Sequence, residues 1–229
     1  MTTPTAPVTI HPFGTVDLVE VEAAAKRAAK NLGLGVEVVK PAPLPIGHFE
    51  AARSQSDARK VVGAVPATVL PPSKPAPGST ADPTATRAAA LSPPESWGSR
   101  VHGPAAAGPA QEAPKGPVAA VRIGVTDTDI FAGQKDFVFV HAEPSYRRAV
   151  VSTRRLKEAF WKRKSDPPRQ QTRLVRELIG AVALAAGAVP CENPVCPASS
   201  ARGPLDIDQK GDRLCPNCDR KVRGGALRL

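Results

Sequence analysis

Residues 191–218 read CENPVCPASSARGPLDIDQKGDRLCPNC and contain all four cysteines of the 229-residue chain. The cysteines form two close pairs, Cys191-x4-Cys196 and Cys215-x2-Cys218, a spacing typical of zinc sites in which four thiolates occupy the corners of a tetrahedron. Turn-forming residues, Asn193-Pro194 and Pro216-Asn217, lie inside the two pairs and favour the tight chain reversals that such a site needs. The sequence therefore predicts one zinc ion held by Cys191, Cys196, Cys215 and Cys218.

A site closed by four sulfurs leaves no open position for a substrate, so we expect this zinc to be structural. The alternatives are two disulfides, which would require an oxidising compartment, or free thiols. Residues 1–14 lack the basic start and apolar core that direct export, and this favours a cytoplasmic protein with a zinc site.

The middle of the chain has the composition of an insertion without a core. Many of the 26 prolines lie between Pro66 and Pro117, among alanine, glycine and serine. Such a stretch cannot bury enough apolar surface to offset the entropy of ordering it. We predict a disordered insertion at residues 64–118, between an N-terminal part (1–63) and a C-terminal part (119–229) of one α/β domain.

Apolar spacing outside the insertion predicts alternating strands and helices. The helix over 16–32 is ended by Gly33, and Asp166-Pro167-Pro168 is a start signal for a long helix over 168–187. No apolar run is long enough to cross a bilayer, so no membrane partner is expected. The predicted strands are 8–10, 36–39, 120–125, 137–140 and 149–152, and a further helix is predicted over 54–62. This order predicts an α/β or α+β domain with a mixed sheet.

The formal net charge of +10 is concentrated in one region of the sequence. Lysine and arginine greatly outnumber acidic residues from Arg147 to Arg176, which is the charge pattern of a surface for an anionic partner such as nucleic acid. A solvated basic surface is the alternative interpretation. Few aromatic residues are available to stack on bases, which weakens the nucleic-acid interpretation.

Several separate motifs, in order along the chain, resemble those of one family. Residues 122–130 (RIGVTDTDI) resemble the "LGVTDvDLy" strand of the archaemetzincins, a family of metzincin-type zinc metallopeptidases. Residues 137–142 (FVFVHA) and 150–156 (VVSTRRL) are similar to their "FVFGeA" and "vvSlaRL" segments, and the cysteine spacing also matches. The resemblance covers nearly the whole chain outside the insertion. It implies a metzincin-like fold with a mostly parallel, twisted sheet and packed helices.

The same resemblance implies that the catalytic site has been lost. In the family, a long helix carries HExxHxxGxxH, and its last histidine directly precedes the first cysteine of the zinc site. That register places the first histidine at Gly180, the general-base glutamate at Ala181, the second histidine at Leu184 and the third at Pro190. None of these four side chains can bind a metal or accept a proton, although the glycine of the motif is kept as Gly187. We therefore expect no catalytic residues.

The expected function is that of a monomeric pseudoenzyme with one structural zinc, binding an extended peptide or a partner protein by strand addition. The alternatives are a basic zinc protein that binds nucleic acid and an unconventional zinc metallopeptidase. No Ser/His/Asp or Cys/His pattern supports catalysis, and the four histidines (His11, His48, His102 and His141) are isolated in the sequence. We expect Glu177, one turn before Gly180, to pair with Arg173 on the same helix.

Overall fold

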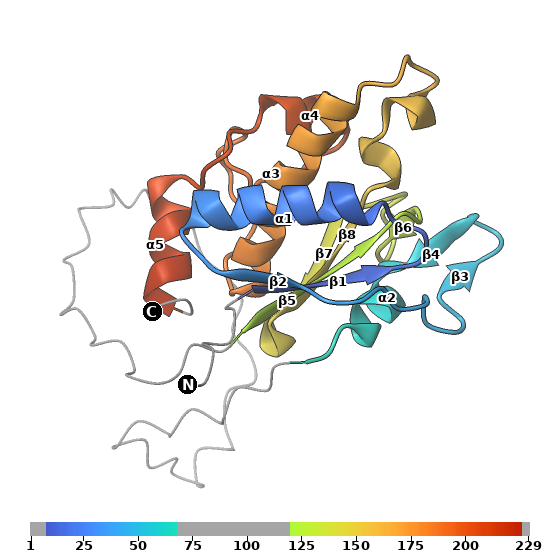
Figure 1. Cartoon of the computed structure of the whole chain (residues 1–229), viewed down its shortest axis with the longest axis horizontal. Helices are drawn as coiled ribbons and strands as arrows, with labels where there is room; N and C mark the ends of the chain where they lie inside the picture. Colours follow the sequence, from blue (N-terminus) through green and yellow to red (C-terminus); the bar gives the residue numbers. More distant parts are fainter. Residues whose placement is uncertain (1–7, 68–119, 226–229) are drawn as a thin grey trace, which may run out of the picture. The chain divides into compact units, whose positions relative to one another are not determined.

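The computed structural model describes residues 8–67 and 120–225 of the chain (Figure 1). Most of the predicted insertion lies outside these described residues, and its disorder stays a prediction. The described part forms one compact unit. In the first range the elements are β1 (Val8–Phe13), α1 (Leu18–Leu32), β2 (Val36–Val38), β3 (Phe49–Glu50), β4 (Gln55–Asp57) and α2 (Ala58–Ala64). In the second range they are β5 (Val121–Thr126), β6 (Ile130–Phe131), β7 (Val140–Glu143), β8 (Arg148–Ser152), α3 (Pro167–Ala185), α4 (Pro204–Gln209) and α5 (Pro216–Gly225).

The main sheet has five strands in the order β2-β1-β5-β8-β7. All neighbours are parallel except the edge strand β7, which runs antiparallel to β8. A smaller sheet of β3, β4 and β6 lies at one end of the unit. The predicted mixed, mostly parallel α/β sheet with packed helices is therefore confirmed.

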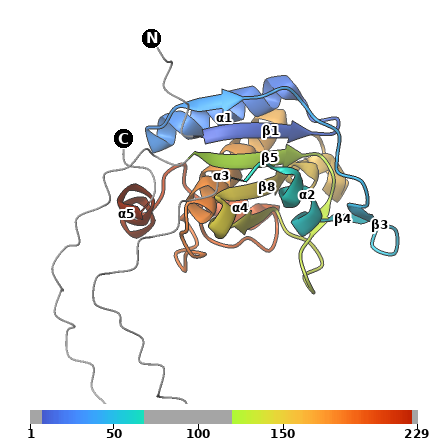
Figure 2. The ribbon, with the colours of Figure 1, turned by 90° about the horizontal axis from the view of Figure 1, so that it is seen from below.

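Helices cover both faces of the main sheet. On one face α1 and α3 pack against each other, and their apolar residues join Ile10, Ile123 and Val151 in the main core (Figure 2). On the other face α2 packs with Val150 and Ile130 in a second, smaller core. Val150 and Val151 point to opposite faces because side chains alternate along a strand. The sheet is thus buried on both sides, as parallel sheets usually are.

The ends of α1 follow the signals in the sequence. Asp17 caps the helix by accepting hydrogen bonds from the backbone N–H groups of Val19 and Glu20. At the other end Gly33 has a left-handed backbone, with φ of 68°, and so ends the helix where it was predicted to end. The apolar stripe between these two ends faces α3 and the sheet.

Two predicted elements are wrong in their bounds. The strand predicted over 137–140 occupies Val140–Glu143, because Val138 instead donates to the Ile130 carbonyl in an isolated bridge. The helix predicted over 54–62 begins only at Ala58, where Asp57 caps α2, and residues 55–57 form β4 beside β6. The short elements β3, β6, α4 and α5 were not predicted, since their stability comes from tertiary contacts and not from periodicity.

Candidate functional site

The four cysteine side chains meet at one point between the C-terminal end of α3 and the start of α5. Their sulfur atoms all lie within 4.8 Å of one another, and Cys191 Sγ is 3.8 Å from Cys215 Sγ. Four ligands at zinc–sulfur distances of about 2.3 Å would be separated by about 3.8 Å at the corners of a tetrahedron. The cluster therefore fits one zinc ion, as the spacing predicted.

Tight local turns hold the cysteines in this position. The N–H of Cys196 donates to the carbonyl of Asn193, and the N–H of Cys191 donates to the carbonyl of Ala198. On the second pair, the N–H of Cys215 donates to the sulfur of Cys196 at 3.5 Å. Backbone donors to sulfur are the contacts that orient thiolates around a metal.

The environment divides the thiols into one that ionises readily and two that do not. A hydrogen bond from the backbone N–H of Cys218 lowers the pKa of Cys215 to about 7. Burial raises the pKa of Cys196 and of Cys218. Because zinc binds thiolates, loading of the site releases protons.

Helix α3 carries Gly180, Ala181 and Leu184, three of the four positions at which the resemblance predicted lost catalytic residues. Gly180 and Leu184, one turn apart, line the same cavity of about 100 Å³, so the predicted register does put them on one face. Ala181 is fully buried in the main core, and Pro190 is exposed beyond the helix end. The structure therefore brings only two of the four positions together.

The helix ends at the glycine that the motif contains. The N–H of Gly187 donates to the Leu184 carbonyl, and the N–H of Ala188 donates to the Ala183 carbonyl. These two bonds, with a φ of 100° at Gly187, form a Schellman motif. Gly187 thus ends α3 with a left-handed backbone.

Gly180 lies directly under the backbone that follows Cys196. A Cβ atom added at Gly180 would be 2.4 Å from the carbonyl oxygen of Pro197, far inside van der Waals contact. No side chain larger than hydrogen fits without movement of that backbone. From the sequence, Gly180 was predicted only as a missing ligand, because this close approach to a distant backbone segment leaves no signal in a single sequence.

A buried ion pair between Lys210 and Glu177 holds residues 197–199 against α3. Lys210 Nζ donates to Glu177 Oε1 at 2.8 Å, to the Ser199 carbonyl at 2.7 Å and to the Pro197 carbonyl at 3.3 Å. Both side chains are almost completely buried, and burial raises the pKa of Glu177 while Lys210 partly offsets that shift. The predicted pairing of Glu177 with Arg173 is wrong, because Arg173 is held by other carboxylates.

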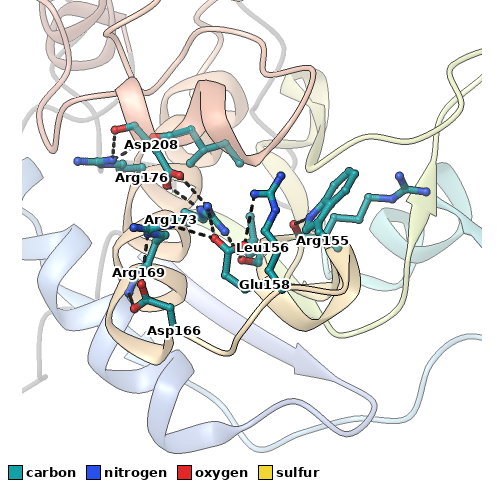
Figure 3. A network of polar contacts seen from close by, with 11 residues as sticks. Arg155, Leu156, Glu158, Asp166, Arg169, Arg173, Arg176 and Asp208 are labelled. Atoms are coloured by element: carbon teal, nitrogen blue, oxygen red, sulfur yellow. Dashed lines mark hydrogen bonds and ion pairs between the residues drawn. The ribbon is translucent and has the colours of Figure 1, made fainter.

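Arg173 is the centre of a buried polar network (Figure 3). Its guanidinium, which is 0% exposed, makes two bonds to Asp208, of 2.7 and 2.6 Å, and one of 2.7 Å to Glu158. A fourth bond, from Nη1 to the Leu156 carbonyl, is 2.9 Å long. The network joins α3 to α4 and to the 3-10 helix at Glu158–Trp161.

Most arginines of the basic region from Arg147 to Arg176 are engaged in ion pairs. Their partners include carboxylates outside that region. The pairs are Arg148–Glu143, Arg155–Asp129, Arg163–Glu158, Arg169–Glu158, Arg173–Asp208 and Arg176–Asp212. The charge counted from the sequence is therefore partly neutralised in the fold.

The three histidines that the structure describes, His11, His48 and His141, do not form a metal site. Among residues 8–67 and 120–225, the four cysteines are the one group of three or more side chains placed to hold a metal ion. His48 contacts the Ser56 hydroxyl at 2.8 Å, and burial lowers the pKa of both His11 and His141. His102 lies outside the described residues.

Within the described part of the chain, no helix combines the length and the apolar character needed to cross a membrane. The longest one, α3, also carries charged side chains along its first half.

Solved structures define the class of fold. The fold resembles a zinc-dependent peptidase from Methanocorpusculum labreanum, with a TM-score of 0.66 and 18% identity over 94% of this chain and 99% of that one. It also resembles archaemetzincin from Archaeoglobus fulgidus, solved with malonate, with a TM-score of 0.62 and 22% identity over 93% and 98% of the two chains. The architecture is that of zinc-dependent peptidases, and at these identities the likeness concerns the fold.

Curated sequences that resemble the chain come from one family. Archaemetzincin of Methanocaldococcus jannaschii is 33% identical over 101 residues, which are 44% of this chain and 56% of the relative. Archaemetzincin of Thermococcus kodakarensis is 33% identical over 100 residues, 44% and 54% of the two chains. The chain thus spans just over half the length of these relatives, and no protein-family model matches it. The resemblance to the archaemetzincin family is confirmed, and the chain is a relative of these proteins.

Proposed function

We propose that this archaemetzincin-like protein holds one structural zinc and binds an extended peptide or partner protein without cleaving it. The observation that supports the proposal is the closure of α3 at Gly180, where the Pro197 carbonyl occupies the space of a side chain. A zinc peptidase needs metal-bound water at this helix face and a carboxylate to accept its proton.

The remaining side chains around the cavity do not replace those groups. The cavity beside Gly180 and Leu184 is lined by Phe137, Phe139 and the small residues 197–201. No histidine is among its lining residues. Glu177 is the one carboxylate in its wall, and that carboxylate is bound to Lys210. This carboxylate is almost completely buried and its Oε1 already accepts a hydrogen bond from Lys210, so it is not open to a water molecule in the cavity.

The proposed role of the zinc follows from its neighbours in the sequence. Cys196 immediately precedes Pro197, and Cys191 pairs with Ser199 through an isolated bridge. Zinc would therefore fix both ends of the segment that covers Gly180. In this proposal the metal maintains the closed surface and takes no part in chemistry.

The edge strand β7 is the proposed peptide-binding element. It has a sheet neighbour, β8, on one side only, and Val140 at its start lines the cavity together with residues 197–201. An edge strand offers unpaired backbone groups that an extended peptide can extend into a further strand. Partner identity would then depend on side chains that enter the small cavity.

Metal analysis combined with a hydrolysis assay tests the first half of the proposal. Zinc content should be close to one per chain by plasma mass spectrometry, and unstructured protein substrates should stay intact. Two zinc ions per chain, or cleavage that a chelator abolishes, would show that a catalytic site exists.

Amide hydrogen exchange tests the second half, because the main sheet offers its own control. Incubation with a library of unstructured peptides should slow exchange at β7, and leave β2, the opposite edge, unchanged. Equal protection at both edges would indicate non-specific association, and no protection at β7 would contradict peptide binding there.

The charge distribution and the free cysteines lead to two smaller proposals. We retain the cytoplasm as the compartment, since four thiols remain available to zinc only under reducing conditions. An anionic partner would have to use the basic region at Arg147–Arg176, where six arginines are already paired with carboxylates. Nucleic-acid binding that persists at physiological salt would favour that alternative.

A further inference from the structure

A second cavity, of about 370 Å³, lies at the carboxyl ends of the central parallel strands. Its walls come from the loops that follow β1, β5 and β8 and from the small sheet. It shares no lining residue with the cavity beside Gly180. Its volume is within the range of small-molecule sites, about 300–1,000 Å³.

The cavity occupies the topological switch point of the sheet. After β1 the chain continues into α1 on one face, whereas after β5 it continues into β6, which packs with α2 on the other face. Because β1 and β5 are neighbours, their loops diverge and leave a crevice between them. In open α/β sheets, ligands bind in the crevice at this point.

Asp127 supplies a negative group to the cavity. Its Oδ2 accepts a hydrogen bond of 2.6 Å from the Thr15 hydroxyl. A Cβ atom at Gly14 would lie 3.2 Å from its Oδ1, and Gly14 has a φ of +73°, so glycine leaves that oxygen open to the cavity. Asp129, two residues on, is by contrast fully engaged by Arg155 and Gln55.

Arg154 supplies a positive group to the same cavity. Its side chain is exposed, and its guanidinium makes no hydrogen bond or ion pair with the residues that the structure describes. The next residue, Arg155, is bound through two nitrogens to Asp129. Arg155 therefore stabilises the fold through its ion pair with Asp129, whereas the guanidinium of Arg154 is available to contact a ligand.

Leu44 and Phe49 give the cavity an apolar wall. Phe49 is 56% exposed although it is aromatic and lies on a strand. The lining contains two carboxylates, of which Asp129 is bound to Arg155. The cavity therefore offers a ligand the carboxylate of Asp127, the guanidinium of Arg154 and an apolar surface. We infer that it binds a free α-amino acid with an apolar side chain, whose ammonium group contacts Asp127 and whose carboxylate contacts Arg154.

Calorimetric titration of the full, zinc-loaded chain tests this inference with four related compounds. L-Leucine should bind, while leucinamide lacks the carboxylate, N-acetyl-leucine lacks the ammonium group and glycine lacks the apolar side chain. Each loss should weaken binding by about tenfold or more, the usual effect of removing a charged hydrogen bond or an apolar contact. Absence of binding by leucine at millimolar concentration, or equal binding of all four compounds, would overturn the inference.

Two variants assign the two charges separately. Arg154→Gln should weaken leucine about tenfold and leave leucinamide unchanged, and Asp127→Asn should weaken leucine about tenfold and leave N-acetyl-leucine unchanged. Lys164→Gln, which removes an exposed positive charge outside the cavity, is the matched control.

Thermal unfolding should show that each variant folds like the parent. If Asp127→Asn does not fold, Thr15→Val, which removes the hydroxyl that orients Asp127, replaces it with the same expected pattern. Binding of leucine unaltered by these variants would place the ligand elsewhere and refute the site. Zinc content and hydrolysis are independent readouts, so failure here leaves the proposed function untouched.

Discussion

The four-cysteine cluster and the C-terminal half of α3 are neighbours in the fold and differ completely in chemistry. The cluster offers four sulfur ligands within 4.8 Å of one another. The helix face offers Gly180 and Leu184, and the Pro197 backbone lies against it. The difference teaches that four metal ligands can meet directly beside a helix face that the backbone of the same chain covers.

The two regions are connected, because the segment that closes the helix face begins at a zinc ligand. Cys196, Pro197 and Ser199 are buried in succession, and Lys210 binds the carbonyls of the latter two. Substitutions can disturb the cluster, this connection, the helix face and the surface separately.

The largest effect is expected when the metal cluster is broken. Cys218→Ser removes one buried sulfur ligand, and structural zinc sites in small peptides contribute about 10–16 kcal/mol on binding. We expect the variant to lose zinc and its unfolding midpoint to fall by about 10 °C or more. Circular dichroism and metal analysis provide the measurement, with the exposed Ser200→Ala as control. A variant that melts like the parent would show that the cluster does not stabilise the fold.

The connection is tested by Lys210→Met. This change leaves Glu177 charged and unpaired in the interior, and such losses destabilise by about 3–5 kcal/mol. Lys135→Met is the matched control, because Lys135 lines the same cavity but is exposed. Urea unfolding of both variants gives the comparison. Equal stability of the two would mean that the buried pair is not needed to hold residues 197–199.

The destabilisation by Lys210→Met should depend on pH in a defined direction. Burial raises the pKa of Glu177 in the folded state, so the folded protein binds this proton more tightly than the unfolded chain does. The contribution of Glu177 to stability is therefore fully present below its ordinary pKa and is lost as the pH rises through the raised value. The variant should recover part of its stability on acidification towards pH 4, whereas the Lys135→Met control should not.

The helix face itself is tested by a pair of glycine substitutions. Gly180→Ala places a methyl group against the Pro197 carbonyl and should destabilise by about 1–3 kcal/mol. Gly63→Ala is the control, because a Cβ there meets nothing within 4 Å and alanine favours a helix by about 1 kcal/mol. Urea unfolding should therefore give opposite signs for the two variants. Equal signs would contradict the closure of the helix face.

The same closure sets the outcome of restoring the motif. With Gly180→His, Ala181→Glu, Leu184→His and Pro190→His combined, zinc content should stay at one per chain or the protein should unfold. Ala181 is buried in the core and Pro190 is exposed beyond the helix, so only two positions share a face. A stable variant with two zinc ions would show that the segment over Gly180 moves aside readily.

The sequence predicted the local features of these regions better than their contacts. The cysteine spacing, the Asp166 start and the Gly187 end of the helix are encoded by neighbouring residues, and the structure contains all three. The contact of Pro197 with Gly180 and the pair of Lys210 with Glu177 join residues 17 and 33 positions apart. A tertiary contact of this kind leaves no periodic signal, and so Glu177 was predicted to pair with Arg173, four residues earlier on its own helix.

The smallest effect on stability is expected from a substitution at Arg169, in the exposed first turn of α3. Arg169 and Arg173 both contact Glu158, but the side chain of Arg169 is 52% exposed and that of Arg173 is 0% exposed. Arg169→Gln should therefore change the free energy of unfolding by less than about 1 kcal/mol, and the difference should shrink at high salt. Urea unfolding at two salt concentrations measures it. A larger loss of stability that does not depend on salt would mean that Arg169 belongs to the buried network around Arg173. That network would then extend to the first turn of α3.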